Sequence, residues 1–495
     1  MRIRRPLLEL LTPDEAGAIV GEACATLASV GVLVEHAGAR ALLRDAGAEA
    51  AGERSRIPER LVRAALASAP RRFTVYDRLA RPALEMGGET VQFDPGSAAI
   101  HRLDAGSWRR RGATTADVAE LVALVDRLPH YAAQSTALAA GDVPREMADR
   151  WRLYVTLSLS VKPVVTGTFR ADGFPPMLAM LEAVRGGARE LRARPLAVFD
   201  CCPSPPLKWS ELTAQALVDC ARAGVPATLV SMPLAGATAP VTLREAVVQH
   251  CAENLSGLVI HQLAAPGAPI TYGGAPAAFD MRQGTTPMGA IETLMIDLAA
   301  AQVGRSLGLP THAYMGLSEA KVPDYQAGLE TGVGAVLAAA GGVNLVSGAG
   351  LLDYLLTQSL EKLLLDHEAC GLALRLARGI ERREADVVAL LGELVARGSL
   401  LGHPHTRANW RRELTVPSAL IDRATYGDWE AAGGRWAHER AADEVARRLA
   451  GPPAEPLPEA VAGELAAIVA AEGRRWGAER LPDLASRAAG EGAAG

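Results

Sequence analysis

Short apolar runs alternate with long helical stretches through the middle of the chain, and this alternation constrains the fold more than any other feature. The clear runs span residues 131–138, 163–167, 195–202, 226–231, 269–273, 310–315 and 343–347, and a weaker eighth spans residues 399–403. Five of them begin with proline, as expected where a helix stops and a strand starts. Seven or eight β/α units over roughly 290 residues predict an α/β fold, a (β/α)8 TIM barrel, whose usual size is about 250 residues.

An open doubly wound sheet is the alternative arrangement of the same elements. That fold usually carries a glycine-rich turn after its first strand to bind a dinucleotide. The sequence has no G-x-G-x-x-G after a predicted strand and no G-x-x-x-x-G-K-[ST] phosphate loop. The barrel is therefore favoured.

Three parts are expected along the chain. Residues 1–112 form an N-terminal helix-plus-hairpin module, with helices at 15–30 and from Pro58, strands at 73–76 and 90–93, and a hairpin at 99–108. Residues 113–410 form the barrel, and residues 411–495 form a helical extension whose tail, from 485, is frayed.

Charge and cysteine content limit the class of protein. Lys and Arg number 51 against 56 Asp and Glu, a net charge of −5, so no basic field favours nucleic acid or an anionic membrane. The cluster Arg109–Arg111 is interpreted as a solvated turn. Six cysteines in 495 residues make no disulfide framework, which suggests a reducing cytoplasm, and no apolar stretch is long enough to span a membrane.

A barrel carries its site at the carboxyl ends of its strands, and glycines gather there. They are Gly167, Gly273, Gly274, Gly316, Gly348 and Gly350. Glycine lets the backbone approach a large ligand closely, and ordinary loop turns are the alternative for each position taken singly. The set as a whole predicts an open mouth.

The densest polar segment of the barrel follows the strand at 310–315. It contains Ser318, Glu319, Lys321 and Asp324, and we expect it at the mouth. In the alternative interpretation Asp324 caps the next helix, while Glu319 and Lys321 form a surface pair.

Aromatic residues make up 4% of the chain, yet Tyr272 and Tyr314 stand at adjacent strand ends, with Phe199 at another. Together they predict a partial aromatic cage for a quaternary ammonium group, and core packing is the alternative. A metal is a further alternative, with Cys202 and either His312 or His403 as ligands. Adjacent strand residues point to opposite faces, so at most one of Cys201 and Cys202 faces inward, and buried free cysteine is the simpler interpretation.

Several segments resemble the trimethylamine:corrinoid methyltransferase superfamily, which includes glycine betaine methyltransferases. They are residues 318–330 (SEAKVPDYQAGLE) and 340–350 (AGGVNLVSGAG), with RIPERLV from 56, APRRFTVY from 69, GDVP from 141 and GHPHT from 402. The resemblance extends over nearly the whole chain. It implies a TIM barrel that moves a methyl group from a methylated amine to the Co(I) of a separate corrinoid protein. It also implies no tightly bound cofactor of the chain's own, and a homo-oligomer.

Trimethylamine-specific members of that superfamily carry pyrrolysine, whereas this chain has only the twenty ordinary amino acids. A quaternary ammonium leaves as a neutral amine without acid help, whereas a tertiary amine must first be activated. A quaternary donor such as a betaine is therefore expected, with catalysis by positioning and desolvation. Tyr272, Tyr314, His312, Phe199 and Arg282 are the predicted donor pocket. A carboxylate on the donor would need a partner such as Arg282, His312 or Lys321.

At the predicted mouth we place Gly273, Gly274, Gly316, Ser318, Glu319, Lys321, Asp324 and Gly348, facing the corrinoid. Two other functions fit the same sequence. One is a metal-dependent lyase or hydrolase, and the other is a non-catalytic quaternary-amine binder.

Overall fold

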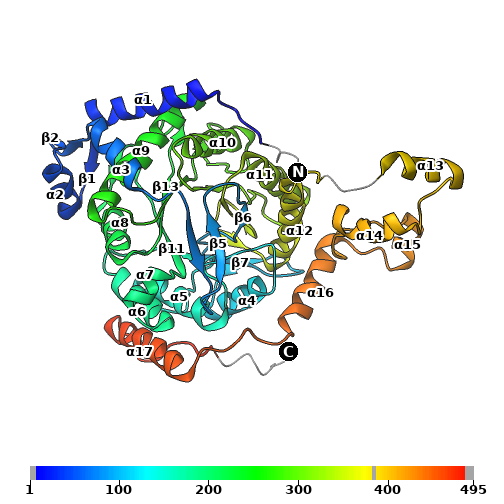
Figure 1. Cartoon of the computed structure of the whole chain (residues 1–495). Helices are drawn as coiled ribbons and strands as arrows, with labels where there is room; N and C mark the ends of the chain where they lie inside the picture. The colour runs from blue at the N-terminus through cyan, green and yellow to red at the C-terminus, as the bar shows by residue number, and fades with distance from the viewer. Residues whose placement is uncertain (1–6, 382–385, 485–495) are drawn as a thin grey trace.

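The computed structural model describes residues 7–381 and 386–484, and a curled eight-stranded parallel sheet ringed by helices lies at its centre (Figure 1). In chain order its strands are β6 (Gln92–Phe93), β9 (Gln134–Ser135), β10 (Val164–Thr166), β11 (Ala197–Cys201), β13 (Ala227–Ser231), β15 (Ile270–Gly274), β17 (Thr311–Tyr314) and β18 (Leu345–Ser347). A parallel bridge between Phe93 and Tyr131 joins β6 to the chain just before β9, so the sheet closes on itself. The predicted (β/α)8 barrel is confirmed.

At least one helix follows every barrel strand. They are α4 (Thr115–Asp126), α5 (Ala148–Leu159) after the short η1 (Arg145–Met147), α6 (Phe174–Arg185) with α7 (Ala188–Ala193), α8 (Glu211–Ala223), α9 (Leu243–Ala264), α10 (Ile291–Ser306), α11 (Tyr325–Gly341) and α12 (Leu360–Ala377). Side-chain caps fix several starts, because Thr114, Ser210, Asp324 and Ser359 each accept a backbone N–H of the first turn.

The predicted eighth strand at 399–403 is wrong. Those residues form the turn between α13 (Val387–Arg397) and α14 (Pro404–Glu413), and Leu401 is 92% exposed. The missing strand is β6, which the sequence pattern assigned to the N-terminal module. The barrel sheet therefore begins before residue 113, while the division of the chain into three parts remains a prediction.

The N-terminal part contains the predicted helices and a small sheet. Its elements are α1 (Pro13–Ser29), β1 (Val32–Val34), α2 (Ala37–Asp45), β2 (Glu49–Ala51), β3 (Arg54–Arg56) and α3 (Glu59–Ser68). Strand β1 pairs with β12 (Lys208–Trp209), which comes from the loop after β11. Both α1 and α3 pack on α9, so this part is joined to the outer wall of the barrel (Figure 1).

A hairpin closes the amino-terminal end of the barrel. Strand β4 (Phe73–Tyr76) pairs with β5 (Pro82–Met86), not with residues 90–93. Val75, Leu84 and Met86 of this hairpin pack against side chains of four barrel strands or the residues beside them, namely Ala133, Val165, Val198 and Leu345. The amide of Tyr76 donates to the carbonyl of Pro195, which precedes β11. Because the hairpin fills this end, a site in the barrel interior can open only at the carboxyl end of the strands.

A second small sheet lies beside the carboxyl end of β18. It contains β7 (His101–Leu103), β8 (Arg110–Gly112), β19 (Leu351–Leu352) and β20 (Thr357–Gln358), and β7 and β8 form the predicted hairpin. Nearby, β14 (Leu234–Ala235) pairs with β16 (Ala277–Ala278). Arg109 and Arg110 are exposed, as the interpretation of Arg109–Arg111 as a solvated turn requires. The turn is wrong for Arg110 and Arg111, which belong to β8, where Arg110 pairs with Asp353 at 2.6 Å and Arg111 pairs with Asp117 at 2.6 Å.

The C-terminal part is helical, as predicted, and only some of it packs on the barrel. After α13 and α14 come α15 (Tyr426–Ala431), α16 (Ala437–Leu449) and α17 (Glu459–Arg475). Helix α16 packs on α12 and α17 packs on α6, whereas α13 projects away from the barrel (Figure 1). The tail predicted to fray lies outside the described residues. Within 7–381 and 386–484, no helix combines the length and apolar character that crossing a bilayer requires.

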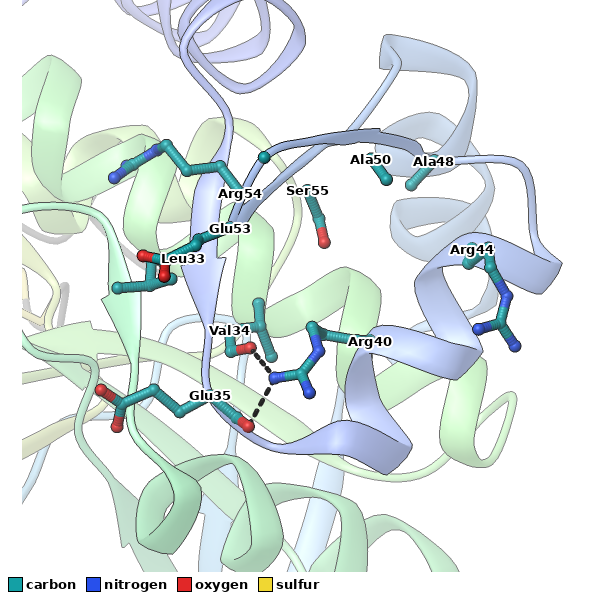
Figure 2. Close-up of a pocket in the computed structure, with 11 residues that line it drawn as sticks. Leu33, Val34, Glu35, Arg40, Arg44, Ala48, Ala50, Glu53, Arg54 and Ser55 are labelled. Atoms are coloured by element: carbon teal, nitrogen blue, oxygen red, sulfur yellow. Dashed lines mark hydrogen bonds between the residues drawn. The ribbon is translucent and has the colours of Figure 1, made fainter.

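The N-terminal part also contains a cavity of about 620 Å³ between α2 and the β1–β3 sheet (Figure 2). Two of its three arginines bond the backbone, and the third, Arg44, pairs with the carboxylate of Asp45 at 2.9 Å. Arg40 donates to the carbonyls of Val34 at 2.7 Å and Glu35 at 2.5 Å, and Arg54 donates to the carbonyl of Gly31 at 3.0 Å. We interpret this cavity as a groove of the module, because each of its arginines already has a partner within the module or its neighbouring loop.

We expect the hairpin plug to contribute strongly to stability. Replacing Leu84, which is fully buried, with Ala should lower the free energy of unfolding by about 2–5 kcal/mol in urea denaturation. Leu79→Ala, in the exposed turn of the same hairpin, should lower it by less than about 1 kcal/mol. Equal losses for the two variants would show that the hairpin does not fill the barrel end.

Candidate active site

A cavity of about 260 Å³ opens at the carboxyl ends of five neighbouring strands, where barrels of this type carry their sites. Gly167, Asp200, Val230, Ala275 and Tyr314, in or just after β10, β11, β13, β15 and β17, form part of its wall. The other lining residues are Ser97, Ala98, Arg152, Thr168, Phe169, Cys201, Cys202, Thr213, Ala216, Met232 and Leu355. We take this cavity as the candidate active site.

Two carboxyl groups meet at this end of the barrel. Asp94, just after β6, is fully buried, and its Oδ1 accepts the amide of Gly96 at 2.8 Å. Burial raises the pKa of Asp94 to about 7. Burial, and then the charge of Asp94, raise the pKa of Asp200 to about 8. Among the described residues, nothing hydrogen-bonds the Oδ1 of Asp200, so the fold leaves this buried oxygen unpaired.

Tyr314 joins Asp200 to the loop that follows β6. Its hydroxyl lies 3.3 Å from both the amide nitrogen and the carbonyl oxygen of Ser97, and 3.5 Å from Oδ2 of Asp200. Burial raises the pKa of Tyr314 well above its ordinary value, so the phenol is neutral. A neutral ring beside a carboxyl group is a suitable surface for a cation.

His312 lies deeper in the barrel, two residues before Tyr314 on the same strand. Its Nε2 is 2.9 Å from Oγ of Ser347, and its ring meets that of Tyr314 edge-on, with centroids 5.2 Å apart. Burial lowers the pKa of His312 to about 3, so the imidazole is neutral. His312 therefore supports Tyr314 from below and does not line the cavity.

Arg152 is the cationic residue of the cavity wall and comes from α5. It is 2% exposed, and it donates to the carbonyls of Thr136 at 2.8 Å and Gly167 at 3.0 Å. The ring of Phe169 covers its guanidinium at 4.1 Å. Burial lowers the pKa of Arg152 to about 10, which leaves it charged at neutral pH.

Two of the aromatic residues predicted for the donor pocket face the helices instead. The hydroxyl of Tyr272 lies 3.3 Å from His250 of α9, and Phe199 packs on Phe174 of α6 at 5.1 Å. Strand register explains the first placement, because Gly273, not Tyr272, lies beside the inward His312. Tyr314 and Phe169 are the aromatic residues among the cavity lining.

Neither Arg282, a predicted partner for a donor carboxylate, nor the polar segment with Ser318, Glu319, Lys321 and Asp324 lines this cavity. Arg282 is exposed in the loop after β16. Ser318 donates to Glu330 at 2.5 Å, and the carboxylate of Glu319 accepts the amides of Met288 and Gly289. Asp324 caps α11, as the alternative interpretation had it.

Lys321 donates to the carbonyl of Glu319 and lies 4.5 Å above the ring of Tyr354. These contacts account for the local geometry of the segment. A role for the four polar residues at the mouth remains a prediction.

The predicted glycines serve close packing at the strand ends. A Cβ on Gly273 would lie 2.9 Å from His312, and one on Gly316 would lie 3.4 Å from the carbonyl of Ser347. Gly274 packs on His250, and Gly348 has a φ of +128°, which a side chain would strain. A Cβ on Gly96 would lie 2.8 Å from the amide of Gly348, so both residues must be glycine for the loop after β6 to reach the cavity.

The described residues offer no cluster of three or more His, Cys, Asp or Glu side chains able to hold a metal. Cys202 does line the cavity, but burial raises the pKa of its thiol well above the ordinary value, which disfavours the thiolate that a metal would need. His403 lies outside the barrel sheet, at the start of α14, with its Nε2 2.9 Å from Glu393. The suggested ligand set of Cys202 with His312 or His403 is not assembled.

Comparison with known proteins identifies the family of the chain. The family model of trimethylamine methyltransferase (MTTB) matches residues 1–477. The chain belongs to this family. It is 31% identical to trimethylamine methyltransferase MttB of Desulfitobacterium hafniense over 429 residues, 86% of each chain. It is 30% identical to the glycine betaine methyltransferase of another strain of that species, over 86% of this chain and 89% of the relative.

A solved structure supports the fold of this family member. The crystal structure of Methanosarcina barkeri monomethylamine methyltransferase (MtmB) superimposes with a TM-score of 0.52 over 90% of this chain and 88% of that one. At 11% identity this likeness concerns the fold alone.

Asp94, Asp200 and Arg152 are the charged residues that sequence reasoning did not select as site residues. Asp200 lies at the end of the predicted strand 195–202, so its position in the sequence could have marked it as a site residue. Asp94 followed a strand assigned to the wrong sheet, and Arg152 lies within a helix, where arginine is ordinarily a surface residue.

The raised pKa of Asp200 predicts a gain of stability on its removal. The unfolded chain releases this proton near pH 4 and the folded protein near pH 8, so wild-type stability falls as the pH rises between those values. The difference in Tm between Asp200→Asn and wild type should therefore increase from pH 5 to pH 8.

Asp280→Asn is the matched control, because amides of Gln283 and Arg282 lower the pKa of Asp280. This control should not gain stability with pH. A Tm difference for Asp200→Asn that stays constant across the range would contradict the burial of an ionisable Asp200.

Proposed function

We propose that this chain transfers a methyl group from a methylated quaternary amine, such as a betaine, to the Co(I) of a separate corrinoid protein. Membership in the methyltransferase family supports methyl transfer, and relatives are named for trimethylamine and for glycine betaine. The observation that carries the choice of donor is Asp200, whose Oδ1 lacks a partner in the described structure while its other oxygen faces the Tyr314 hydroxyl. A carboxylate and a ring suit a permanent cation.

The transfer is a displacement at carbon. The C–N bond breaks and its electron pair stays on nitrogen, while the methyl carbon accepts an electron pair from Co(I), the methyl acceptor. A quaternary nitrogen becomes a neutral tertiary amine, so no proton is needed. The contribution of the chain is to hold the donor in line and to exclude water from it.

Each residue of the cavity has a place in this scheme. Ionised Asp200 and the ring of Tyr314 hold the ammonium, and His312 with Ser347 fixes the position of Tyr314 from below. The corrinoid stays on its partner protein, which docks at the carboxyl end of the barrel near Ser318, Glu319, Lys321 and Asp324. The chain then needs no tightly bound cofactor, and we place it in the cytoplasm as a homo-oligomer.

A tertiary amine is the second candidate donor, and the raised pKa of Asp200 favours it. A protonated Asp200 at neutral pH can keep a proton on a tertiary nitrogen, so that the amine leaves as a neutral secondary amine. The two donors therefore require opposite protonation states of the same carboxyl group.

The pH dependence of methyl transfer distinguishes them. With a quaternary donor, KM should fall on the order of tenfold from pH 6 to pH 9 as Asp200 ionises, because the anion attracts the cation. With a tertiary donor, kcat/KM should fall over the same range. The measurement is methylcobalamin formation on a Co(I) corrinoid protein encoded beside this gene.

Other outcomes of that assay would identify a different function or refute the proposed one. Thermal stabilisation by quaternary amines without methylcobalamin would identify a binder and not an enzyme. Neither binding nor transfer across a donor panel would refute the proposed function.

Replacing each of the two tyrosines with leucine, in separate variants, tests which ring contacts the donor. Tyr314→Leu should raise the KM of the donor about threefold to thirtyfold, because a cation–ring contact is lost. Tyr272→Leu, on the neighbouring strand but facing α9, should lower Tm and leave KM unchanged. Equal changes in KM would contradict the placement of Tyr314 in the donor pocket.

A further inference from the structure

Arg152 makes fewer hydrogen bonds than a buried guanidinium requires. Two of its five N–H groups reach the carbonyls of Thr136 and Gly167, and its Nε is buried without any partner in the described part of the chain. A buried donor without an acceptor is unfavourable, so its presence calls for an explanation. The explanation that the surroundings support is a ligand, because Arg152 lines the cavity of the candidate site.

The guanidinium is held in a fixed orientation in the wall of that cavity. The two carbonyls anchor its Nη atoms from the ends of β9 and β10, and the ring of Phe169 covers one of its faces at 4.1 Å. A planar, pre-oriented guanidinium matches a carboxylate, which accepts two parallel N–H bonds. Arg152 and Asp200 thus give one cavity of about 260 Å³ a cationic and an anionic wall.

We propose that Arg152 binds the carboxylate of the methyl donor while Asp200 and Tyr314 face its ammonium, so that the site selects zwitterionic donors, the betaines, over quaternary amines that lack an acid group. This inference rests on the proposed function and narrows it. It moves the carboxylate contact from Arg282, His312 and Lys321, none of which lines the cavity, to a residue of α5 that does.

Binding without the corrinoid protein isolates this contact. Isothermal titration of the full chain should compare glycine betaine with choline, which keeps the trimethylammonium group and replaces the carboxylate with an alcohol. Wild type should bind the betaine about tenfold to a hundredfold more tightly, the range expected for a charge-assisted bidentate contact. Arg152→Gln should remove most of that preference and leave choline affinity within about threefold.

Arg150→Gln is the matched control, two residues away on α5. Arg150 is equally buried but pairs with Asp149, Asp172 and Glu472 and does not line the cavity. This variant should lose stability and keep the wild-type ratio of betaine to choline affinity.

Three results would overturn the inference. They are equal binding of betaine and choline by wild type, an equal loss of both ligands in Arg152→Gln, and the same change of ratio in Arg150→Gln. If Arg152→Gln does not fold, titration of wild type with glycine betaine methyl ester still tests the inference. Esterification removes the negative charge of the carboxylate, so it should weaken binding by the same factor that separates betaine from choline. Binding of neither ligand, with no methyl transfer from any quaternary amine, would instead count against the proposed function.

Discussion

The parallel bridge between Phe93 and Tyr131 is the contact on which the rest of the structure depends. It closes the barrel with a strand of two residues, and the same short strand delivers Asp94 and Gly96 to the carboxyl end of the sheet. Closure removes the sheet edges, and the β4–β5 hairpin fills the opposite end. The interior is then accessible from one side, and the charged groups gather there.

Those charges oppose folding and favour binding. Asp94 and Asp200 lie near each other with little solvent, and burial raises the pKa of both toward or above neutrality. Arg152 has an unmatched donor in the same wall. A structure selected for stability alone would pair or remove these groups, so their retention is a mark of a site that completes its interactions with a ligand.

The sequence predicted the barrel because parallel strands buried on both faces are short apolar runs, and prolines marked where they begin. It predicted a strand at 90–93 but did not assign it to the barrel, because so short a strand carries no period and its pattern equally suits a hairpin. It did not predict the facing of Tyr272, because the direction of a side chain depends on register, and Gly273 took the inward position beside His312. The alternation of side chains along a strand held for His312 and Tyr314 on β17, which share a face. It failed at the end of β11, where Cys201 and Cys202 both line the cavity.

The protonation of Asp200 also connects donor binding with product release under the proposed function. A quaternary ammonium beside Asp200 lowers its pKa and favours loss of the proton, so the donor binds as an ion pair. Methyl transfer leaves an uncharged amine, so the pairing of a permanent cation with the carboxylate is lost, and the pKa of Asp200 is no longer lowered below its resting value of about 8. A carboxyl group with an ordinary pKa would stay charged and would not weaken its hold in this way. The burial that destabilises Asp200 in the folded chain is thus the property that lets it distinguish the donor from the demethylated product.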